Sequence, residues 1–98
     1  MDCKVIISNR AIQDLQEIVR YISFDNPQAA EQLGNRLIEA ALSLGTLPER
    51  GRFVPEFQDG VTREIFYRPY RIVYRINAQD KVVWISRFWH HARTSLSD

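Results

Sequence analysis

Residues 63–93 read REIFYRPYRIVYRINAQDKVVWISRFWHHAR, and this stretch decides the fold. Apolar and polar side chains alternate along it, which is the period of a β-strand with two unlike faces. Short polar links at 68–69 and 77–80 divide it into three segments. We therefore expect strands over residues 62–67, 70–76 and 81–89 that form an antiparallel meander, with one apolar face and one face rich in arginine and histidine.

The first half of the chain predicts one strand and two helices. Residues 3–7 (CKVII) are a short apolar run typical of a buried strand, and Ser8 or Asn9 can cap a helix that follows. Asn26 and Pro27 end that helix and begin another, because asparagine is a good N-cap and proline fits the first helical turn. Two helices joined by so short a link are expected to lie antiparallel.

Each predicted helix has an apolar stripe at steps of three and four residues. Asp14 falls on the wet side of the first helix, and Gly45 is expected to end the second in a left-handed conformation. The first stripe comprises Ile12, Leu15, Ile18, Val19 and Ile22. The second comprises Ala30, Leu33, Leu37, Ala41 and Leu44.

Strict alternation assigns the faces of the predicted strands. The helices are expected to cover the face of the middle strand that carries Tyr70, Ile72, Tyr74 and Ile76. Both faces of the last strand are apolar, which places that strand inside the sheet. Its first face holds Val82, Trp84, Ser86, Phe88 and His90, and its second holds Val83, Ile85, Arg87 and Trp89.

The predicted order is β-α-α-β-β-β, an α+β fold in which a helical hairpin packs on one face of an antiparallel sheet. The first strand can join the meander at its edge or its centre. Prolines and glycines mark residues 46–60 as a surface loop, long enough to suggest a role of its own. With 98 residues, the whole chain, 1–98, is expected to be one domain.

Composition narrows the class of protein. Hydrophobic residues make up 45% and charged residues 26%, which is ordinary for a soluble globular chain. No apolar run of 18 residues and no signal peptide is present, and the single Cys3 cannot form an internal disulfide, so we expect a cytoplasmic protein without membrane contact. A net charge of +1 is weak support for a dedicated nucleic-acid binder.

The basic character is concentrated in the C-terminal part. Residues 61–98 hold seven arginine and lysine residues against three acidic ones, whereas residues 1–60 hold six against nine. Nearly all of these C-terminal cations are arginine, which suits bidentate contact with carboxylate or phosphate. The candidate cationic group comprises Arg63, Arg71, Arg75, Arg87, His90, His91 and Arg93.

Two interpretations of this group stay open. Its arginines could hold phosphate or acidic side chains while His90 acts as an acid or base. Alternatively, the group is the solvated face of the sheet and pairs with Glu56, Glu64 and Asp80. The adjacent His90 and His91 should point to opposite sides of a strand, and no third ligand is evident, so no metal site or cofactor is expected.

Aromatic residues gather in the same region. Nine of the eleven aromatic residues follow residue 52, more than a core of this size needs. Tryptophan, tyrosine and arginine dominate interface hot spots, so some of these side chains, Trp89 among them, are expected to be covered by a partner.

Three segments in this order carry a family resemblance: LGTLPERGRFVPEF (44–57), VTREIFYRPYRIVYRI (61–76) and VVWISRFWHHAR (82–93). With the helical hairpin that begins DLQEIVRYI, they resemble the ParE/RelE superfamily of type II toxin-antitoxin toxins, and most closely its ParE, or plasmid stabilisation, branch. The resemblance implies a toxin that forms a hetero-oligomer with a cognate antitoxin, whose helical and extended segment wraps it.

The resemblance also implies one of two targets. RelE-like members enter the ribosomal A site and cut mRNA with a set of basic residues, whereas ParE-like members lack that set and poison DNA gyrase. By motif position, Arg71 matches an arginine that would hold a phosphate in the nuclease, Arg63 lies roughly where RelE-like toxins place a lysine, and His90 lies where some carry a catalytic histidine.

The sequence departs from the nuclease pattern in two places. No tyrosine or lysine follows Trp89, and Glu64 adds negative charge where nucleases are basic. We therefore expect a binding inhibitor of DNA gyrase with no catalytic residues of its own. The alternatives are a ribosome-dependent mRNA interferase using Arg63, Arg71 and His90, and a remnant that binds antitoxin without an active target. The expected binding residues are Arg63, Arg71, Arg75, Arg87, Trp89, His90, His91 and Arg93.

Overall fold

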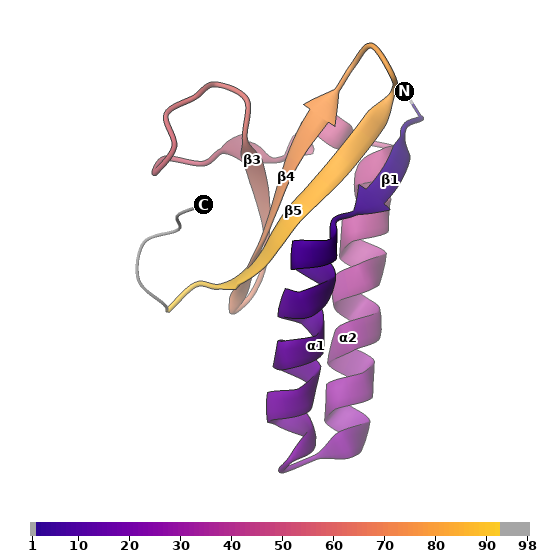
Figure 1. Cartoon of the computed structure of the whole chain (residues 1–98), viewed down its shortest axis with the longest axis vertical. Coiled ribbons are helices and arrows are strands. Elements are labelled where there is room, and N and C mark those ends of the chain that lie inside the picture. The colour runs from indigo at the N-terminus through magenta and orange to yellow at the C-terminus, as the bar shows by residue number, and fades with distance from the viewer. Residues whose placement is uncertain (1, 93–98) are drawn as a thin grey trace.

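A computed structural model describes residues 2–92 and shows a helical hairpin packed against one face of a twisted sheet (Figure 1). The far end of the hairpin projects beyond the sheet. The helices and strands are β1 (Lys4–Ile7), α1 (Asn9–Ser23), α2 (Pro27–Leu42), β2 (Arg52–Phe53), β3 (Arg63–Tyr67), β4 (Tyr70–Asn77) and β5 (Val82–His90), with short 3₁₀ turns at Ser43–Gly45 and Pro48–Arg50.

The sheet has five strands in the order β1-β5-β4-β3-β2. β3, β4 and β5 form the predicted antiparallel meander, and β5 lies inside the sheet as expected. β1 pairs with β5 in parallel, so the sheet is mixed, and the first strand occupies an edge. The α+β class is confirmed, but the loop prediction for residues 46–60 was wrong in part because this segment contains β2, which pairs with β3.

Both helices begin where the sequence predicts. Ser8 is the N-cap of α1, and its Oγ accepts a hydrogen bond of 3.1 Å from the backbone N–H of Ala11. Asn26 caps α2 in the same way, with 3.0 Å between its Oδ1 and the nitrogen of Ala29. A side-chain acceptor at this position satisfies a backbone donor that has no partner inside the helix, which fixes the start of each helix.

Gly45 does not end α2 in a left-handed conformation, so that prediction was wrong. It lies in the 3₁₀ turn after α2, and among the glycines described only Gly60 has a positive φ. Its role is a close approach: Cys3 donates a backbone hydrogen bond of 2.7 Å to the Gly45 carbonyl, and a Cβ at residue 45 would lie only 2.7 Å from the Cys3 oxygen. The glycine therefore lets β1 run against the end of the hairpin.

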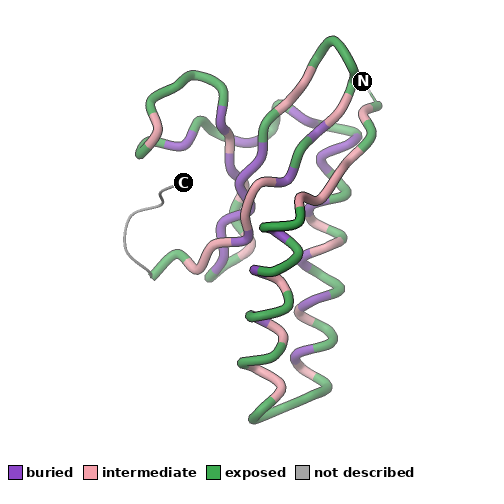
Figure 2. Tube along the Cα trace, viewed as in Figure 1, coloured by how far each residue is buried: buried purple, intermediate pink, exposed green. Residues whose placement is uncertain are grey.

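The buried side of α1 differs from the predicted stripe. Ala11, Asp14 and Ile18 are buried, whereas Ile12 is 41% exposed. Asp14 was expected on the wet side, and that prediction was wrong because its carboxylate binds Arg87 of β5. The pattern of buried and exposed positions along the hairpin, with an exposed tip, is visible in Figure 2.

A β-bulge at Ser86 exchanges the faces of the second half of β5. Tyr74 of β4 pairs with Ile85 and the adjacent Val73 pairs with Arg87, so Ser86 is skipped in the register. One inserted residue moves every later side chain to the opposite face. Ile85 and Phe88 consequently lie in the same core, and the prediction of strict alternation along β5 was wrong beyond Ile85.

The core between sheet and hairpin is built on the predicted face of β4. Tyr70, Ile72 and Tyr74 are buried in it, and Tyr74 is fully enclosed. The Tyr74 hydroxyl donates a hydrogen bond of 2.6 Å to the Pro48 carbonyl and accepts one of 2.9 Å from the backbone N–H of Gly51. Burial raises the pKa of Tyr74 above its ordinary value, so the hydroxyl stays protonated and able to donate well into the alkaline range.

Replacing Tyr74 with phenylalanine should lower the free energy of unfolding by about 2–4 kcal/mol, because a buried N–H and a buried C=O each lose their partner. Urea unfolding followed by tryptophan fluorescence measures the loss. Tyr21→Phe is the matched control, since Tyr21 is 79% exposed and its variant should stay within about 0.5 kcal/mol of the parent. Equal stability of the two variants would contradict the assignment of these hydrogen bonds.

Candidate functional site

The face of the sheet that the helices leave uncovered, here called the open face, carries three arginines of the predicted cationic group. The strand register places Arg71 and Arg75 of β4 on this face, opposite the core residues of the same strand. Beyond the bulge, Arg87 and Trp89 of β5 join them. The sequence pattern predicts Arg71 and Arg75 on this face, but it does not predict the bulge that brings Arg87 and Trp89 beside them.

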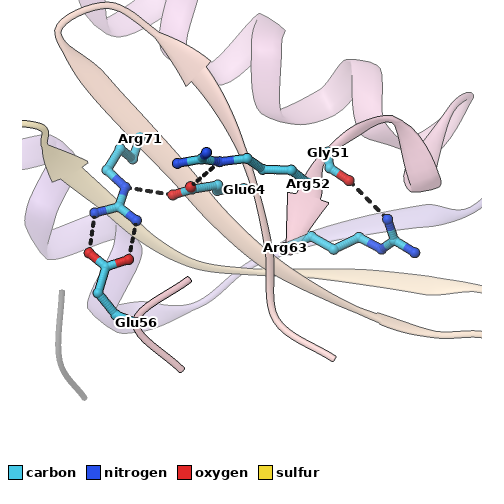
Figure 3. Close-up of polar contacts among 6 residues, drawn as sticks. All are labelled: Gly51, Arg52, Glu56, Arg63, Glu64 and Arg71. Atoms are coloured by element: carbon cyan, nitrogen blue, oxygen red, sulfur yellow. Dashed lines mark hydrogen bonds and ion pairs between the residues drawn. The ribbon is translucent and has the colours of Figure 1, made fainter. Parts of the chain in front are cut away.

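Arg71 is enclosed by two carboxylates (Figure 3). Its Nη1 and Nη2 donate hydrogen bonds of 2.7 and 2.8 Å to the two oxygens of Glu56, and its Nε donates to Glu64. Arg71 is only 5% exposed, and the bidentate contact with Glu56 is the main reason that its pKa is raised. The guanidinium group that the resemblance assigns to a phosphate is therefore already bound by carboxylates of the same chain.

Glu64 links Arg71 to a second arginine. Its side chain is fully buried, and its other oxygen accepts a hydrogen bond of 2.8 Å from Nε of Arg52, whose side chain is 57% exposed. A buried carboxylate requires paired charge, and here it receives two guanidinium groups. This arrangement supports the interpretation in which the arginines pair with Glu56 and Glu64, whereas Asp80, the third predicted partner, contacts Asn77 instead.

Arg75 is held by the loop before β3. Its Nε donates a hydrogen bond of 3.0 Å to the Thr62 hydroxyl, and its Nη2 lies 3.6 Å from an oxygen of Asp59. Asp59 accepts hydrogen bonds from the backbone N–H and hydroxyl of Thr62 and from the N–H of Val61. These bonds favour its charged form and lower the pKa of Asp59 to about 2.

Arg87 and Asp14 join β5 to α1. Arg87 donates two hydrogen bonds, of 2.7 and 3.0 Å, to the two oxygens of Asp14, which also accepts from the backbone N–H of Phe88 at 3.1 Å. β1 ends at Ile7, so this part of β5 is paired with β4 on one edge but has no strand on the other, and Asp14 supplies the missing acceptor. A sequence signal for Asp14 does exist, because it lies at helical spacing between the buried Ala11 and Ile18.

Arg63 and His90 lie on the other side of the sheet. Arg63 pairs in register with Tyr74, and its Nη1 donates to the Gly51 carbonyl at 2.8 Å. His90 pairs with Tyr70 and makes an edge contact with its ring. Tyr70 and Tyr74 are four residues apart along β4, roughly 13 Å, so Arg63, Arg71 and His90 do not converge on one point.

The remaining predicted residues are distributed as follows. His91 makes an edge contact with Phe66, so it points away from His90 as the sequence predicts. Trp89 packs beside Val54 and Val73 under the guanidinium of Arg87. Arg93 lies outside the described residues. Within residues 2–92, no cluster of three metal-binding side chains is present, and no helix is long and apolar enough to cross a membrane.

A groove of about 550 Å³ separates α1 from the end of β5. Ile18, Tyr70 and Phe88 give it an apolar interior, and Tyr21, which is 79% exposed, stands at its rim. The complete lining is Asp14, Glu17, Ile18, Tyr21, Tyr70, Phe88, His90 and Ala92. An exposed tyrosine over an apolar groove is typical of a protein-binding surface.

Comparisons with known proteins agree with this architecture. Residues 5–94 match the model of a family described as the ParE toxin of the type II toxin-antitoxin system parDE. A relative in Caulobacter vibrioides named Toxin RelE2 is 37% identical over 90 residues, which covers 92% of this chain and 97% of the relative.

Two solved structures share the fold. The chromosomal ParDE TA system from P. aeruginosa superimposes with a TM-score of 0.74 at 20% identity, covering 90% of this chain and 95% of that one. The toxin-antitoxin complex RelBE2 from Mycobacterium tuberculosis gives 0.71 at 24% identity, covering 92% and 99%.

Removing the buried carboxylate by Glu64→Leu should lower the free energy of unfolding by about 3 kcal/mol, because Arg71 then stays buried with part of its charge uncompensated. The double variant Glu64→Leu/Arg71→Met should recover part of this loss, which urea unfolding can measure. Glu39→Leu, at an exposed position of α2, serves as the control. Additive losses in the double variant would show that the two side chains are not coupled.

The Asp59 carboxyl should titrate near pH 2 rather than at its ordinary 3.8, as followed by NMR of its side chain. Its hydrogen bonds stabilise the loop fully above about pH 4, and this contribution is lost as the pH falls towards 2. Thr62→Val removes the hydroxyl donor and should raise the midpoint towards 3.8. An unchanged midpoint in this variant would exclude the hydroxyl as a cause.

Proposed function

Because the chain belongs to the ParE toxin family of type II toxin-antitoxin systems, within the ParE/RelE superfamily, we propose that it inhibits growth when free and is neutralised by a cognate antitoxin. The two solved structures described above come from a ParDE toxin-antitoxin system and a RelBE2 toxin-antitoxin complex, which supports a protein partner of this kind.

The groove between α1 and β5 is the proposed seat of a helical part of the antitoxin. Its apolar interior and the exposed Tyr21 favour an amphipathic helix, whose apolar side would enter the groove. Phe24, also 79% exposed, extends the apolar surface of α1 towards the hairpin tip. Covering both rings would remove a large apolar area from water.

For the cellular target, we propose DNA gyrase, inhibited by binding and without chemistry by the toxin itself. The observation that carries this proposal is the enclosure of Arg71 by Glu56 and Glu64. A nuclease of this fold would need the Arg71 guanidinium to bind a phosphate. Arg71 is only 5% exposed and is paired with two carboxylates, so it has no pair of N–H groups free for bidentate contact with a phosphate. The wide separation of Arg63 and His90 agrees with a surface that binds rather than cuts.

A second candidate is a ribosome-dependent mRNA interferase, which the relative named Toxin RelE2 favours. For this activity Arg71 would have to exchange Glu56 for a phosphate of the mRNA. Glu56 belongs to the loop between β2 and β3 and its side chain is 23% exposed, so displacement of that loop would release one fork of Arg71. Glu64 would stay in place, because it is fully buried in β3.

Purified toxin at micromolar concentration should inhibit supercoiling by DNA gyrase, and the same toxin bound to its antitoxin should not. In a translating extract, a reporter mRNA should stay intact. An inactive toxin in the gyrase assay, together with mRNA loss that Arg71→Ala abolishes and Glu56→Ala increases, would reject gyrase and identify the interferase. Arg36→Ala, at an exposed position of α2, controls for the loss of an arginine.

A further inference from the structure

A separate hollow, of about 400 Å³, lies on the open face between the first turn of α1 and the loop before β3. None of the side chains that line it is acidic. By contrast, Asp14 and Glu17 line the groove along α1, and Glu64 lines a hollow at the edge of β3. The lining of the hollow on the open face is Arg10, Phe57, Thr62, Val73, Arg75, Ser86 and Arg87.

Three guanidinium groups converge here with N–H groups to spare. The side chain of Arg10 is 62% exposed, and its only ion pair with a described residue is with Asp14 at 3.9 Å, beyond hydrogen-bond range. Arg75 is 51% exposed and uses only Nε in a hydrogen bond, while its Nη2 remains 3.6 Å from Asp59. Arg87 gives Nε and Nη2 to Asp14, which leaves Nη1 without a hydrogen bond inside residues 2–92.

The walls of the hollow suit a carboxylate carried on an apolar chain. Val73, which is buried, and the half-buried Phe57 provide apolar surface beside the guanidinium groups, and the hydroxyl of Ser86 adds a polar contact. The Thr62 hydroxyl already donates to Asp59, so it does not serve as a donor here. Trp84, paired with Arg75 in the register, is 44% exposed on the same face. In a bound segment, an acidic residue would therefore contact the guanidinium groups, and its apolar neighbours would contact the apolar walls.

We propose that this hollow binds an acidic side chain of the antitoxin. The inference rests on the proposed function and adds the chemistry of the contact. A nucleic acid would need a row of free cations along its phosphates, but the neighbouring Arg71 and Arg52 are already paired with carboxylates. One cluster of three arginines in a chain of net charge +1 suits a single carboxylate better than it suits the row of phosphates in a nucleic acid.

Charge reversal at the exposed arms tests the proposal. Arg10→Glu and Arg75→Glu should each weaken binding of the cognate antitoxin by about tenfold, measured by calorimetry, because a guanidinium partner becomes a repelling carboxylate. The loss should shrink at high salt, since both side chains are about half exposed. Arg36→Glu makes the same change of charge on the exposed side of α2 and should leave the affinity unchanged.

The possible results separate the two levels of inference. Unchanged affinity in both variants, or an equal loss in Arg36→Glu, overturns the assignment of the hollow while the toxin-antitoxin function stands. Failure of the parent chain to bind the antitoxin overturns both. Binding of a labelled single-stranded RNA that Arg10→Glu abolishes, with antitoxin affinity intact, also overturns the assignment. Should Arg75→Glu fail to fold by circular dichroism, Arg10→Glu alone decides the result, because its side chain lies on the surface.

Discussion

The buried carboxylate of Glu64 is the constraint on which the arrangement of the open face depends. A charge inside a protein is strongly disfavoured unless it is paired and hydrogen-bonded, so this residue requires two arginines within reach. Arg71 from β4 and Arg52 from β2 meet the requirement, and Arg71 in turn draws Glu56 and its loop over the sheet. One acidic side chain of β3 thus links the two neighbouring strands and one loop.

The C-terminal part of the chain is basic in sequence, but in the fold its arginines are largely neutralised by carboxylates. Each arginine of the candidate group that the structure describes contacts a carboxylate, a carbonyl or an aromatic ring. Paired guanidinium groups cannot serve as a track for phosphates, which agrees with recognition by shape and by selected contacts. Guanidinium N–H groups without a hydrogen bond to any described residue remain where Arg10, Arg75 and Arg87 line one hollow. These unused donors distinguish this hollow from the rest of the open face.

The sequence predicts the elements of this fold well because local physics determines them. Period-two alternation in YRIVYRI and the caps Ser8 and Asn26 act over a few residues, and both are confirmed. The failures involve distant partners: Asp14 is buried only because Arg87, 73 positions away, meets it. β2 has two residues, too few for any period to show. The charge pattern of the sequence is enough to suggest that arginines of this group pair with Glu56 and Glu64. The bidentate contact of Arg71 with Glu56 could not be predicted, because it depends on how the loop folds over β4.

The bulge at Ser86 has a consequence for how relatives of this chain are compared. Residue-by-residue alignment assumes that matched positions share an environment, but a relative without the bulge would present every matched side chain after this point to the opposite layer. Matching letters in the WHHAR segment would then join residues that never occupy equivalent places. Residue roles can be transferred from a relative past Ser86 only after the strands of the two structures have been superimposed. A single insertion or deletion at this point of β5 would also change which side chains face a partner.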